Sequence, residues 1–266
     1  MKNPVRTLRR SLLMTALLLG LSMPAFAQEA APAAAAPPGQ YISPEAKAVL
    51  DRMNAYMKGL QAYTIQAHGT RDEVIAHGYK LQNNEAAALS VQRPNKMRAE
   101  VRGDIRDRDF VYDGKTITIN SPDDNAYATA PATDKLGVLI EDLLQSDSVE
   151  LPLVDVLYQA TAGTLTENVQ NGLLVGDSIV EGVICDHLAF RQADTDWQLW
   201  VEKGDRPLPR KIVITTRYEV GDPQFSAVMT WNTQPKFDKD SFTFEAPKDA
   251  NHVQFVQPEV FLAGDK

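Results

Sequence analysis

The stretch FVYDGKTITI, residues 110–119, carries the clearest structural signal in the chain. Asp113 and Gly114 separate two runs of aromatic and β-branched residues, and both turn residues tolerate a positive φ. The pattern therefore predicts a tight antiparallel hairpin centred on these two residues.

Alternating apolar residues extend this strand pattern on both sides of the hairpin. Upstream, Tyr63, Ile65 and Ala67 begin a strand, and downstream Glu181-Gly182, Gly204-Asp205 and Gly221-Asp222-Pro223 are typical of the turns of a meander. One apolar and one polar face are expected of an antiparallel sheet that curls around its contents. The alternating residues after Gly163 are Ile184, Leu188 and Phe190, then Trp197, Leu199 and Val201, then Ile212 and Ile214, then Phe225, Ala227, Met229 and Trp231.

Two segments have helical rather than strand spacing. Ser43-Pro44-Glu45 predicts a helix start, because Ser caps free N–H groups, Pro suits the first helical position and Glu favours the positive end of the dipole. This helix is expected to run to about Lys58 and end at Gly59. In the middle of the chain, helical spacing and Pro152 predict two helices, with apolar residues Leu136, Leu139, Ile140, Leu143, Leu144, Leu153, Val154, Val156 and Leu157. Periodicity alone leaves open whether these side chains fill a core or line a cavity.

The first residues of the chain resemble an export signal. Four basic residues precede the apolar run from Leu12 to Leu21, and Ala25-Phe26-Ala27 fits signal peptidase cleavage. We therefore expect a signal peptide at 1–27, a disordered Ala/Pro linker at 28–40, one domain at 41–260 and a flexible tail at 261–266. These features predict the periplasm of a Gram-negative cell, with no transmembrane segment once the signal is removed.

The charge balance argues against two classes of partner. Loss of the signal's four positive charges, with no negative ones, takes the formal net charge from −8 to −12. Binding to nucleic acid requires a basic surface, and an anionic protein is also repelled by anionic membranes. Neither partner is expected.

No arrangement of residues predicts catalysis, a metal or a cofactor. Cys185 is the single cysteine and shares a strand face with His187, but no oxyanion-hole glycine or third orienting residue accompanies them. The four histidines lack the short spacing of a zinc site. Turn chemistry explains the acidic pairs Asp123-Asp124 and Asp104 with Asp107. We therefore expect no catalytic residues, no metal site and no cofactor.

Four local motifs, in this order, resemble the LolA-like fold of periplasmic lipoprotein carriers. They are Leu60-Gln61-Ala62-Tyr63-Thr64, Arg93-Pro94-Asn95 with Lys96-Met97-Arg98, Asp113-Gly114-Lys115-Thr116 running to Pro122, and Phe242-Thr243-Phe244-Glu245-Ala246-Pro247, which looks like a closing strand. The stretch 207–212 looks more like an uncharacterised family of predicted periplasmic proteins, and we place the chain there as a LolA-like relative.

The resemblance implies an α+β fold, mainly antiparallel β, in the form of a half-open curved barrel with the helices 134–160 as a lid. It also implies a carrier or sensor of a lipid or lipoprotein acyl chain, with an envelope protein as possible donor or acceptor, and no enzymatic activity. Arg93 resembles a latch that reaches backbone carbonyls of the lid. The expected ligand-binding residues are Leu136, Leu139, Ile140, Leu143, Leu188, Phe190, Trp197, Leu199, Ile212, Ile214, Phe225, Met229 and Trp231.

A second hypothesis belongs to another class of function. The same fold with a filled core could serve as a structural or regulatory envelope module that acts through protein–protein contacts. Trp200, expected on the face opposite Trp197 and Leu199, is then a candidate contact residue.

Overall fold

The computed structural model describes residues 41–144, 153–154, 157–158 and 162–254, which lie in one compact unit, 38–266. The predicted signal peptide 1–27, linker 28–40 and tail 261–266 lie outside the described residues. In chain order the elements are β1 (Tyr41–Ile42), α1 (Pro44–Gly59), β2 (Ala62–Val74), the 3₁₀ turn η1 (Ala76–Gly78), β3 (Lys80–Gln92), β4 (Lys96–Gly103), β5 (Arg108–Tyr112), β6 (Thr116–Ser121), β7 (Ala126–Pro131), α2 (Leu136–Leu144), β8 (Asn171–Val180), β9 (Val183–Arg191), β10 (Thr195–Glu202), β11 (Pro209–Thr216), β12 (Gln224–Asn232) and β13 (Asn251–His252).

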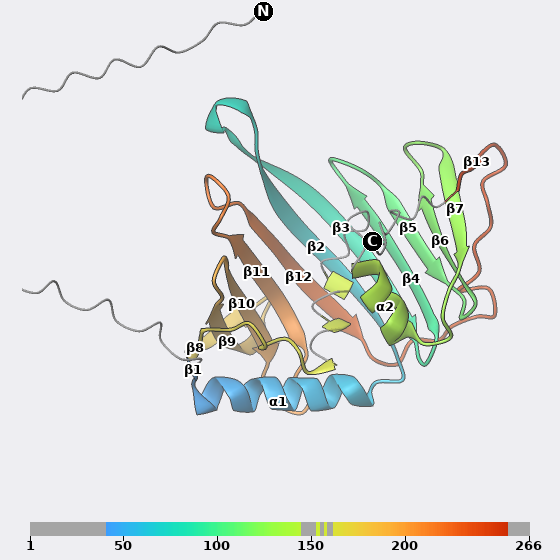
Figure 1. The fold of residues 1–266 in the computed structure, drawn as a ribbon. Helices are drawn as coiled ribbons and strands as arrows, with labels where there is room; N and C mark the ends of the chain where they lie inside the picture. Colours follow the sequence, from blue (N-terminus) through green and yellow to red (C-terminus); the bar gives the residue numbers. More distant parts are fainter. Residues whose placement is uncertain (1–40, 145–152, 155–156, 159–161, 255–266) are drawn as a thin grey trace, which may run out of the picture. The chain divides into compact units, whose positions relative to one another are not determined.

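All described strands form one wide sheet (Figure 1). Its order is β1-β8-β9-β10-β11-β12-β2-β3-β4-β5-β6-β7-β13. Every pairing is antiparallel except the two terminal ones, β1 with β8 and β13 with β7. The predicted meander is therefore confirmed, and β12 joins it to the first half of the sheet through β2.

The sheet is open, which corrects the prediction of a half-open barrel in one respect. β1 and β13 end the strand order at opposite edges and do not pair with each other. The mainly antiparallel α+β class is as expected. The lid of helices 134–160 is described only for α2 and for the helical residues Leu153, Val154, Leu157 and Tyr158.

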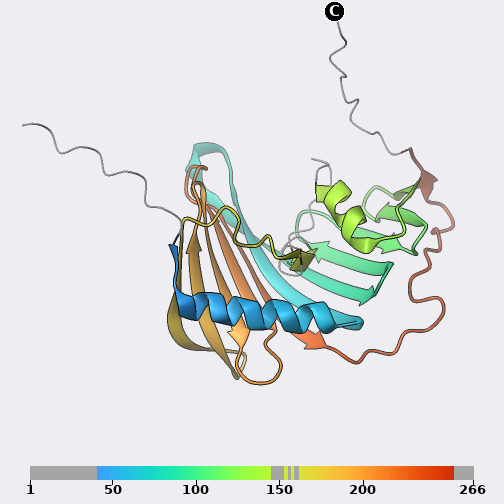
Figure 2. The same ribbon diagram turned by 60° about the horizontal axis from the view of Figure 1, so that its bottom comes forward.

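The sheet has a first half, β2–β7, and a second half, β8–β12. The predicted apolar face of the second half is found, and it belongs to the side of the sheet that α1 and α2 cover, which we call the inner face (Figure 2). Leu188, Leu199 and Ile212 are direct cross-strand neighbours, and each is at most 1% exposed. Ile184 shares this face as predicted, but it is 56% exposed because it lies beside the Glu181-Gly182 turn at the end of its hairpin.

Helix α1 forms as predicted and crosses the inner face. Ser43 caps it, because its side-chain oxygen accepts a hydrogen bond from the Ala46 N–H at 3.2 Å, and Pro44 occupies the first turn. Near its start, the Ser43 N–H donates to the Gly172 carbonyl of β8. In its middle, Arg52 pairs with the buried Asp186 of β9 at 3.2 Å. The buried side of the helix consists of Ala46, Val49, Leu50, Met53 and Met57.

The predicted Asp113-Gly114 hairpin joins β5 to β6. The Asp113 carboxylate accepts the N–H groups of Lys115 and Thr116, both at 2.8 Å, and Gly114 has a φ of +95°. Burial on its own would raise the pKa of Asp113, but these backbone hydrogen bonds lower it overall. A Cβ at Gly114 would lie 2.6 Å from the Asn95 side chain, so the hairpin packs against the Arg93-Pro94-Asn95 corner.

The segment after β12 covers the outer face of the first half of the sheet. Phe242 is buried there, Arg98 donates to the Thr243 carbonyl at 3.4 Å, and Phe244 packs against Tyr127. The expectation of a closing strand at 242–247 is wrong, because these contacts are made by side chains and irregular backbone. Strand pairing begins only at Asn251.

Candidate functional site

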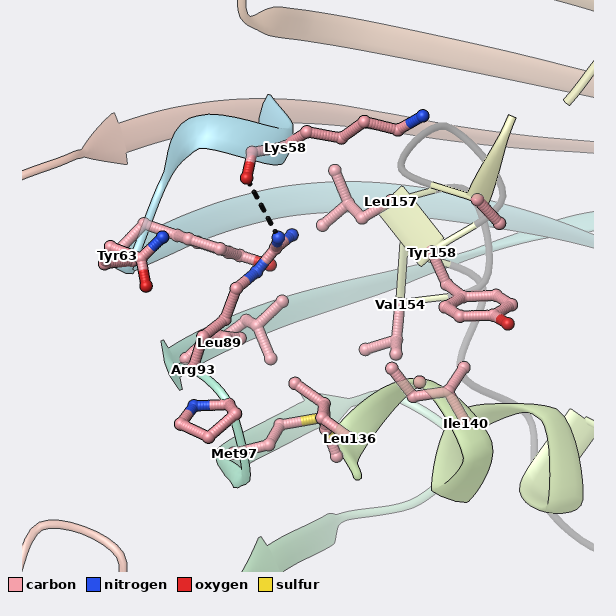
Figure 3. Close-up of a pocket in the computed structure, with 15 residues that line it drawn as sticks. Lys58, Tyr63, Leu89, Arg93, Met97, Leu136, Ile140, Val154, Leu157 and Tyr158 are labelled. Atoms are coloured by element: carbon pink, nitrogen blue, oxygen red, sulfur yellow. Dashed lines mark hydrogen bonds between the residues drawn. The ribbon is translucent and has the colours of Figure 1, made fainter. Parts of the chain in front are cut away.

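A cavity of about 590 Å³ lies between the first half of the inner face and the helices (Figure 3). Strands β2, β3 and β4 form one wall, α2 with Val154, Leu157, Tyr158 and Ala162 forms another, and the end of α1 lies at one side. The lining residues are Lys58, Gln61, Tyr63, Leu89, Val91, Arg93, Pro94, Met97, Leu136, Gly137, Ile140, Val154, Leu157, Tyr158 and Ala162.

Most of this lining is apolar. Leu89, Val91 and Met97 are buried inner-face residues of adjacent strands, since Val91 pairs with Met97 across the ladder. Leu136 and Ile140 face them from one side of α2, because residues four apart share a helical face. Concave apolar volumes of this size, with a few polar groups at fixed places, are typical of small-molecule binding sites.

The polar groups gather at the end of the cavity where α1 stops. Arg93 Nη1 donates to the Lys58 carbonyl at 3.2 Å, and the Arg93 backbone N–H donates to the Gln61 carbonyl at 2.8 Å. Burial raises the pKa of Tyr63, and the charge of Arg93 with the hydrogen bond it makes to Tyr63 partly opposes that increase. Arg93 therefore connects the last turn of α1 to the first residues of β2.

The β3–β4 corner also holds the start of α2. The Leu136 N–H donates to the Pro94 carbonyl at 3.3 Å, and the Tyr112 hydroxyl donates to the Thr133 carbonyl just before the helix at 2.6 Å. Two walls of the cavity thus meet at one corner of the chain.

The resemblance predicts that Arg93 contacts the segment 134–160. Among the described residues, Arg93 instead donates to a carbonyl at the C-terminal end of α1. The end of α1 can accept this hydrogen bond because the last carbonyls of any helix lack intrahelical partners. A latch role for Arg93 toward 134–160 stays a prediction.

The expected ligand-binding residues divide into two groups. Leu136 and Ile140 line the cavity, whereas Leu139 and Leu143 are buried on α2 without lining it. The other expected residues pack into the core of the second half of the sheet and do not line this cavity. They are Leu188, Phe190, Trp197, Leu199, Ile212, Ile214, Phe225, Met229 and Trp231.

The sequence reasoning missed most of the cavity. Leu89, Val91 and Met97 are not among the expected ligand-binding residues, although they flank the Arg93-Pro94-Asn95 corner. The corner is the sequence feature that could have identified these three residues as neighbours, because residues next to a sharp turn between two strands lie at the same end of the sheet. Periodicity gives the face of a residue but not what lies opposite it.

Cys185 and His187 share the outer face of β9, as predicted. Cys185 is fully buried, and burial raises the pKa of its thiol while the charge of Arg210 acts in the opposite direction. A raised pKa keeps the sulfur protonated, which is the reverse of an activated nucleophile. The His187 ring is occupied by a 2.9 Å hydrogen bond to Gln198 and by stacking.

Trp200 lies on the outer face as predicted, but its proposed role as an exposed contact is wrong. It is only 8% exposed, because His187 stacks on its ring at 4.1 Å and the Lys211 ammonium lies 4.9 Å from the ring centroid. Its indole N–H donates to Ser178 at 3.1 Å. Trp200 is therefore a structural residue of the outer face.

Other candidate sites have structural roles. Asp104 accepts the Asn84 N–H at 2.7 Å and Asp123 accepts the Asp107 N–H at 2.7 Å, so both carboxylates join segments that are 20 and 16 positions apart rather than closing their own turns. Within the described ranges, no group of three His, Cys, Asp or Glu side chains is placed to hold a metal ion. None of the described helices has both the length and the apolar character needed to cross a membrane.

Comparisons with known proteins agree with the predicted family. A family model described as "Predicted periplasmic protein (DUF2092)" matches residues 46–256. No curated protein matches the chain.

Several solved structures share similarity with it. An uncharacterized conserved protein from Thermus thermophilus has a TM-score of 0.46 at 14% identity, covering 79% of this chain and 99% of that one. The lipoprotein LppX of Mycobacterium tuberculosis has a TM-score of 0.46 at 14% identity, covering 74% and 100%. A LolA superfamily protein from Nitrosomonas europaea has a TM-score of 0.34 at 11% identity, covering 75% and 97%.

The link between α2 and Tyr158 provides a test by pH. The Tyr158 hydroxyl donates to the Glu141 carboxylate, and this bond, together with burial, raises the pKa of Tyr158 from 10.0 to about 12. Only the neutral hydroxyl donates, so the link is fully present below pH 10 and lost as the pH rises through about 12.

We expect Glu141→Gln to bring the ionisation of Tyr158 back toward its ordinary pKa. The near-ultraviolet absorbance of tyrosinate during an alkaline titration measures this shift, and Tyr158→Phe identifies which ionisation belongs to Tyr158. Glu45→Gln, at an exposed position on α1, is the matched control. Identical titration curves for the wild type and Glu141→Gln would show that the link does not exist in solution.

Proposed function

The chain belongs to the DUF2092 family of predicted periplasmic proteins, and we propose that it is a non-catalytic carrier or sensor that holds a lipid or a lipoprotein acyl chain in its apolar cavity. The observation that carries this proposal is the cavity itself, about 590 Å³ and lined by Leu89, Val91, Met97, Leu136 and Ile140. An acyl chain needs apolar volume and no specific polar partner.

The energetics of burial support an acyl chain as the occupant. Each buried methylene contributes about 0.8 kcal/mol, so a chain of about ten contributes roughly 8 kcal/mol before the cost of association. A net gain of about 4 kcal/mol corresponds to a dissociation constant of about 1 mM, and longer chains bind more tightly. Reversible loading and release are compatible with such affinities.

Gly137 gives a direct way to fill the cavity. It lines the cavity from α2, and a Cβ there would lie 3.4 Å from the Tyr158 ring, which is an ordinary contact. Gly137 is the second residue of α2, and replacing a helical Gly removes an entropic cost of at most roughly 0.5–1 kcal/mol, so a larger residue does not weaken α2.

We expect Gly137→Leu to lower the affinity for a fluorescent fatty acid by about tenfold or more. The leucine side chain excludes about two methylenes of the ligand, which together contribute roughly 1.6 kcal/mol. Gly137→Ala is the control, because it gains the same helix stability but fills much less volume. Equal fatty-acid affinity in both variants, measured by fluorescence titration, would contradict binding in this cavity.

We also propose that Arg93 acts as a latch on the cavity walls. Arg93 holds the end of α1, and Pro94 beside it holds the first N–H of α2. Loss of the Arg93 bond should loosen the corner to which α2 is attached.

Arg93→Leu is therefore expected to increase amide exchange in α2, from Leu139 to Leu144, in the unliganded protein. Hydrogen exchange measured by mass spectrometry reads this out directly. The amides of β9, remote from the corner, serve as the internal reference. Unchanged exchange in α2 would mean that Arg93 holds only the end of α1.

A second candidate function, a regulatory envelope module that contacts another protein, is favoured by a different surface. Apolar side chains are exposed at two neighbouring hairpin tips, where Lys80 Nζ donates to the Gly221 carbonyl at 3.0 Å. Tyr79 is 67% exposed and Val220 82%. Positive and negative residues are interspersed at both tips, so the surface lacks the positive excess that attracts an anionic membrane and suits a protein partner better.

A photoreactive residue at Val220 is expected to form one discrete crosslink to an envelope protein in cells. That crosslink should disappear when Tyr79→Ser is added, because both tips belong to the same surface. The same photoreactive residue at the exposed Lys239 is the control. A crosslink that persists in the Tyr79→Ser background would show that the tips are not a specific contact.

A further inference from the structure

The cavity has an unusual charge for this protein. The full chain has a formal net charge of −8, yet the cavity lining contains Lys58 and Arg93 and no Asp or Glu. Both cations lie at the end where α1 stops, and the apolar lining begins directly beside them (Figure 3). The cavity is thus amphipathic, with positive charge at one end only.

Many other cations of the described part of the chain are paired with carboxylates. Examples are Arg52 with Asp186, Arg102 with Asp109 at 2.7 Å and Arg191 with Asp196 at 2.6 Å. Neither Lys58 nor Arg93 has a carboxylate partner among the described residues. Glu141 of α2, which lies near the cavity, accepts the Tyr158 hydroxyl and is not part of the lining.

Both cations also have N–H groups that can donate hydrogen bonds to a ligand. Arg93 uses Nη1 for the Lys58 carbonyl and makes a hydrogen bond to Tyr63, which leaves most of its N–H donors for another acceptor. The Lys58 side chain is on the exposed side of the last turn of α1, so its ammonium keeps its solvation until a ligand arrives. An oxyanion is a stronger acceptor than a carbonyl for both groups.

We propose that the cavity selects amphiphiles with an anionic headgroup, a phosphate or a carboxylate, bound by Lys58 and Arg93. The acyl chain of the ligand lies against Leu89, Val91 and Ile140. This inference rests on the proposed lipid-binding function and adds the class of headgroup. An uncharged amphiphile with the same chain gains the apolar contacts but not the two charged ones.

Matched ligands separate the contribution of the headgroup from that of the chain. Dodecanoate, dodecyl phosphate and dodecanol have the same chain, and isothermal titration calorimetry gives each dissociation constant below the micelle concentrations of the two anions and the solubility limit of dodecanol. We expect both anions to bind the purified protein about tenfold to a hundredfold more tightly than dodecanol, as charge-assisted hydrogen bonds predict. Acetate and inorganic phosphate, which lack the chain, should bind too weakly to detect.

Lys58→Gln is the decisive variant, because it removes the ammonium and keeps the backbone carbonyl that Arg93 contacts. It should lower the affinity for both anionic ligands by about tenfold and leave the affinity for dodecanol unchanged. Arg106→Gln removes the same charge from an exposed position in the β4–β5 turn and should change neither. Arg93→Gln should act like Lys58→Gln, with partial recovery in Arg93→Lys, and Lys58→Gln carries the test if the Arg93 variants do not fold.

The possible failures point to different conclusions. If all three ligands bind equally and Lys58→Gln changes none of them, headgroup selection is wrong while the carrier proposal stands. If none of the three binds, the proposed function itself is wrong. If inorganic phosphate binds as tightly as dodecyl phosphate, the site takes a free anion, and the inference of an amphiphilic ligand is overturned.

Discussion

The need to remove one face of a very wide sheet from water determines the rest of this structure. In the described part of the chain, thirteen strands form a single open sheet, and its inner face is apolar from β9 to β7. Apolar area gains roughly 25 cal/mol per Å² when it is buried, so such a face cannot stay exposed. In the described residues this face is covered by two helices and by the helical residues after 153.

The two halves of the sheet meet this need differently. Under α1 the large side chains of the second half fill the space themselves, as shown by the Phe190 and Trp197 rings stacked at 4.0 Å. The first half carries smaller inner-face residues, including Ala87 and Ala99, and is covered by the short α2. The cavity lies between the part of the inner face that α1 covers and the part that α2 covers. Arg93 lies beside the end of α1, at this boundary.

The outer face shows why its polar and reactive residues are structural. Cys185, Val180 and Trp200 form a small second core there, and the segment around Phe242 covers the other half. Asp109 is almost buried on this face, where it forms an ion pair with Arg102 at 2.7 Å and accepts a hydrogen bond from Asn120 at 2.9 Å. Buried polar groups with such partners stabilise the sheet and leave function to the inner side.

The sequence alone determined the elements whose signals are local. The Ser43 cap, the end of α1, the Asp113-Gly114 turn and the alternation of the strands all depend on residues within a few positions of one another, and all were predicted correctly. The Arg93-Pro94-Asn95 corner was recognised as important by resemblance. Local signals also predicted the face of the sheet on which Trp200 lies, but they did not predict that its side chain is buried.

Only the tertiary structure decided which apolar residues surround a space and which fill one. Leu89 and Leu199 have the same strand pattern, yet one lines the cavity and the other is packed in the core. Likewise, the acceptor of Arg93 is a carbonyl thirty-five positions away in α1. Both outcomes depend on where a helix crosses the sheet, which is set by long-range packing, and periodicity reports the face of a residue without reporting what lies opposite it.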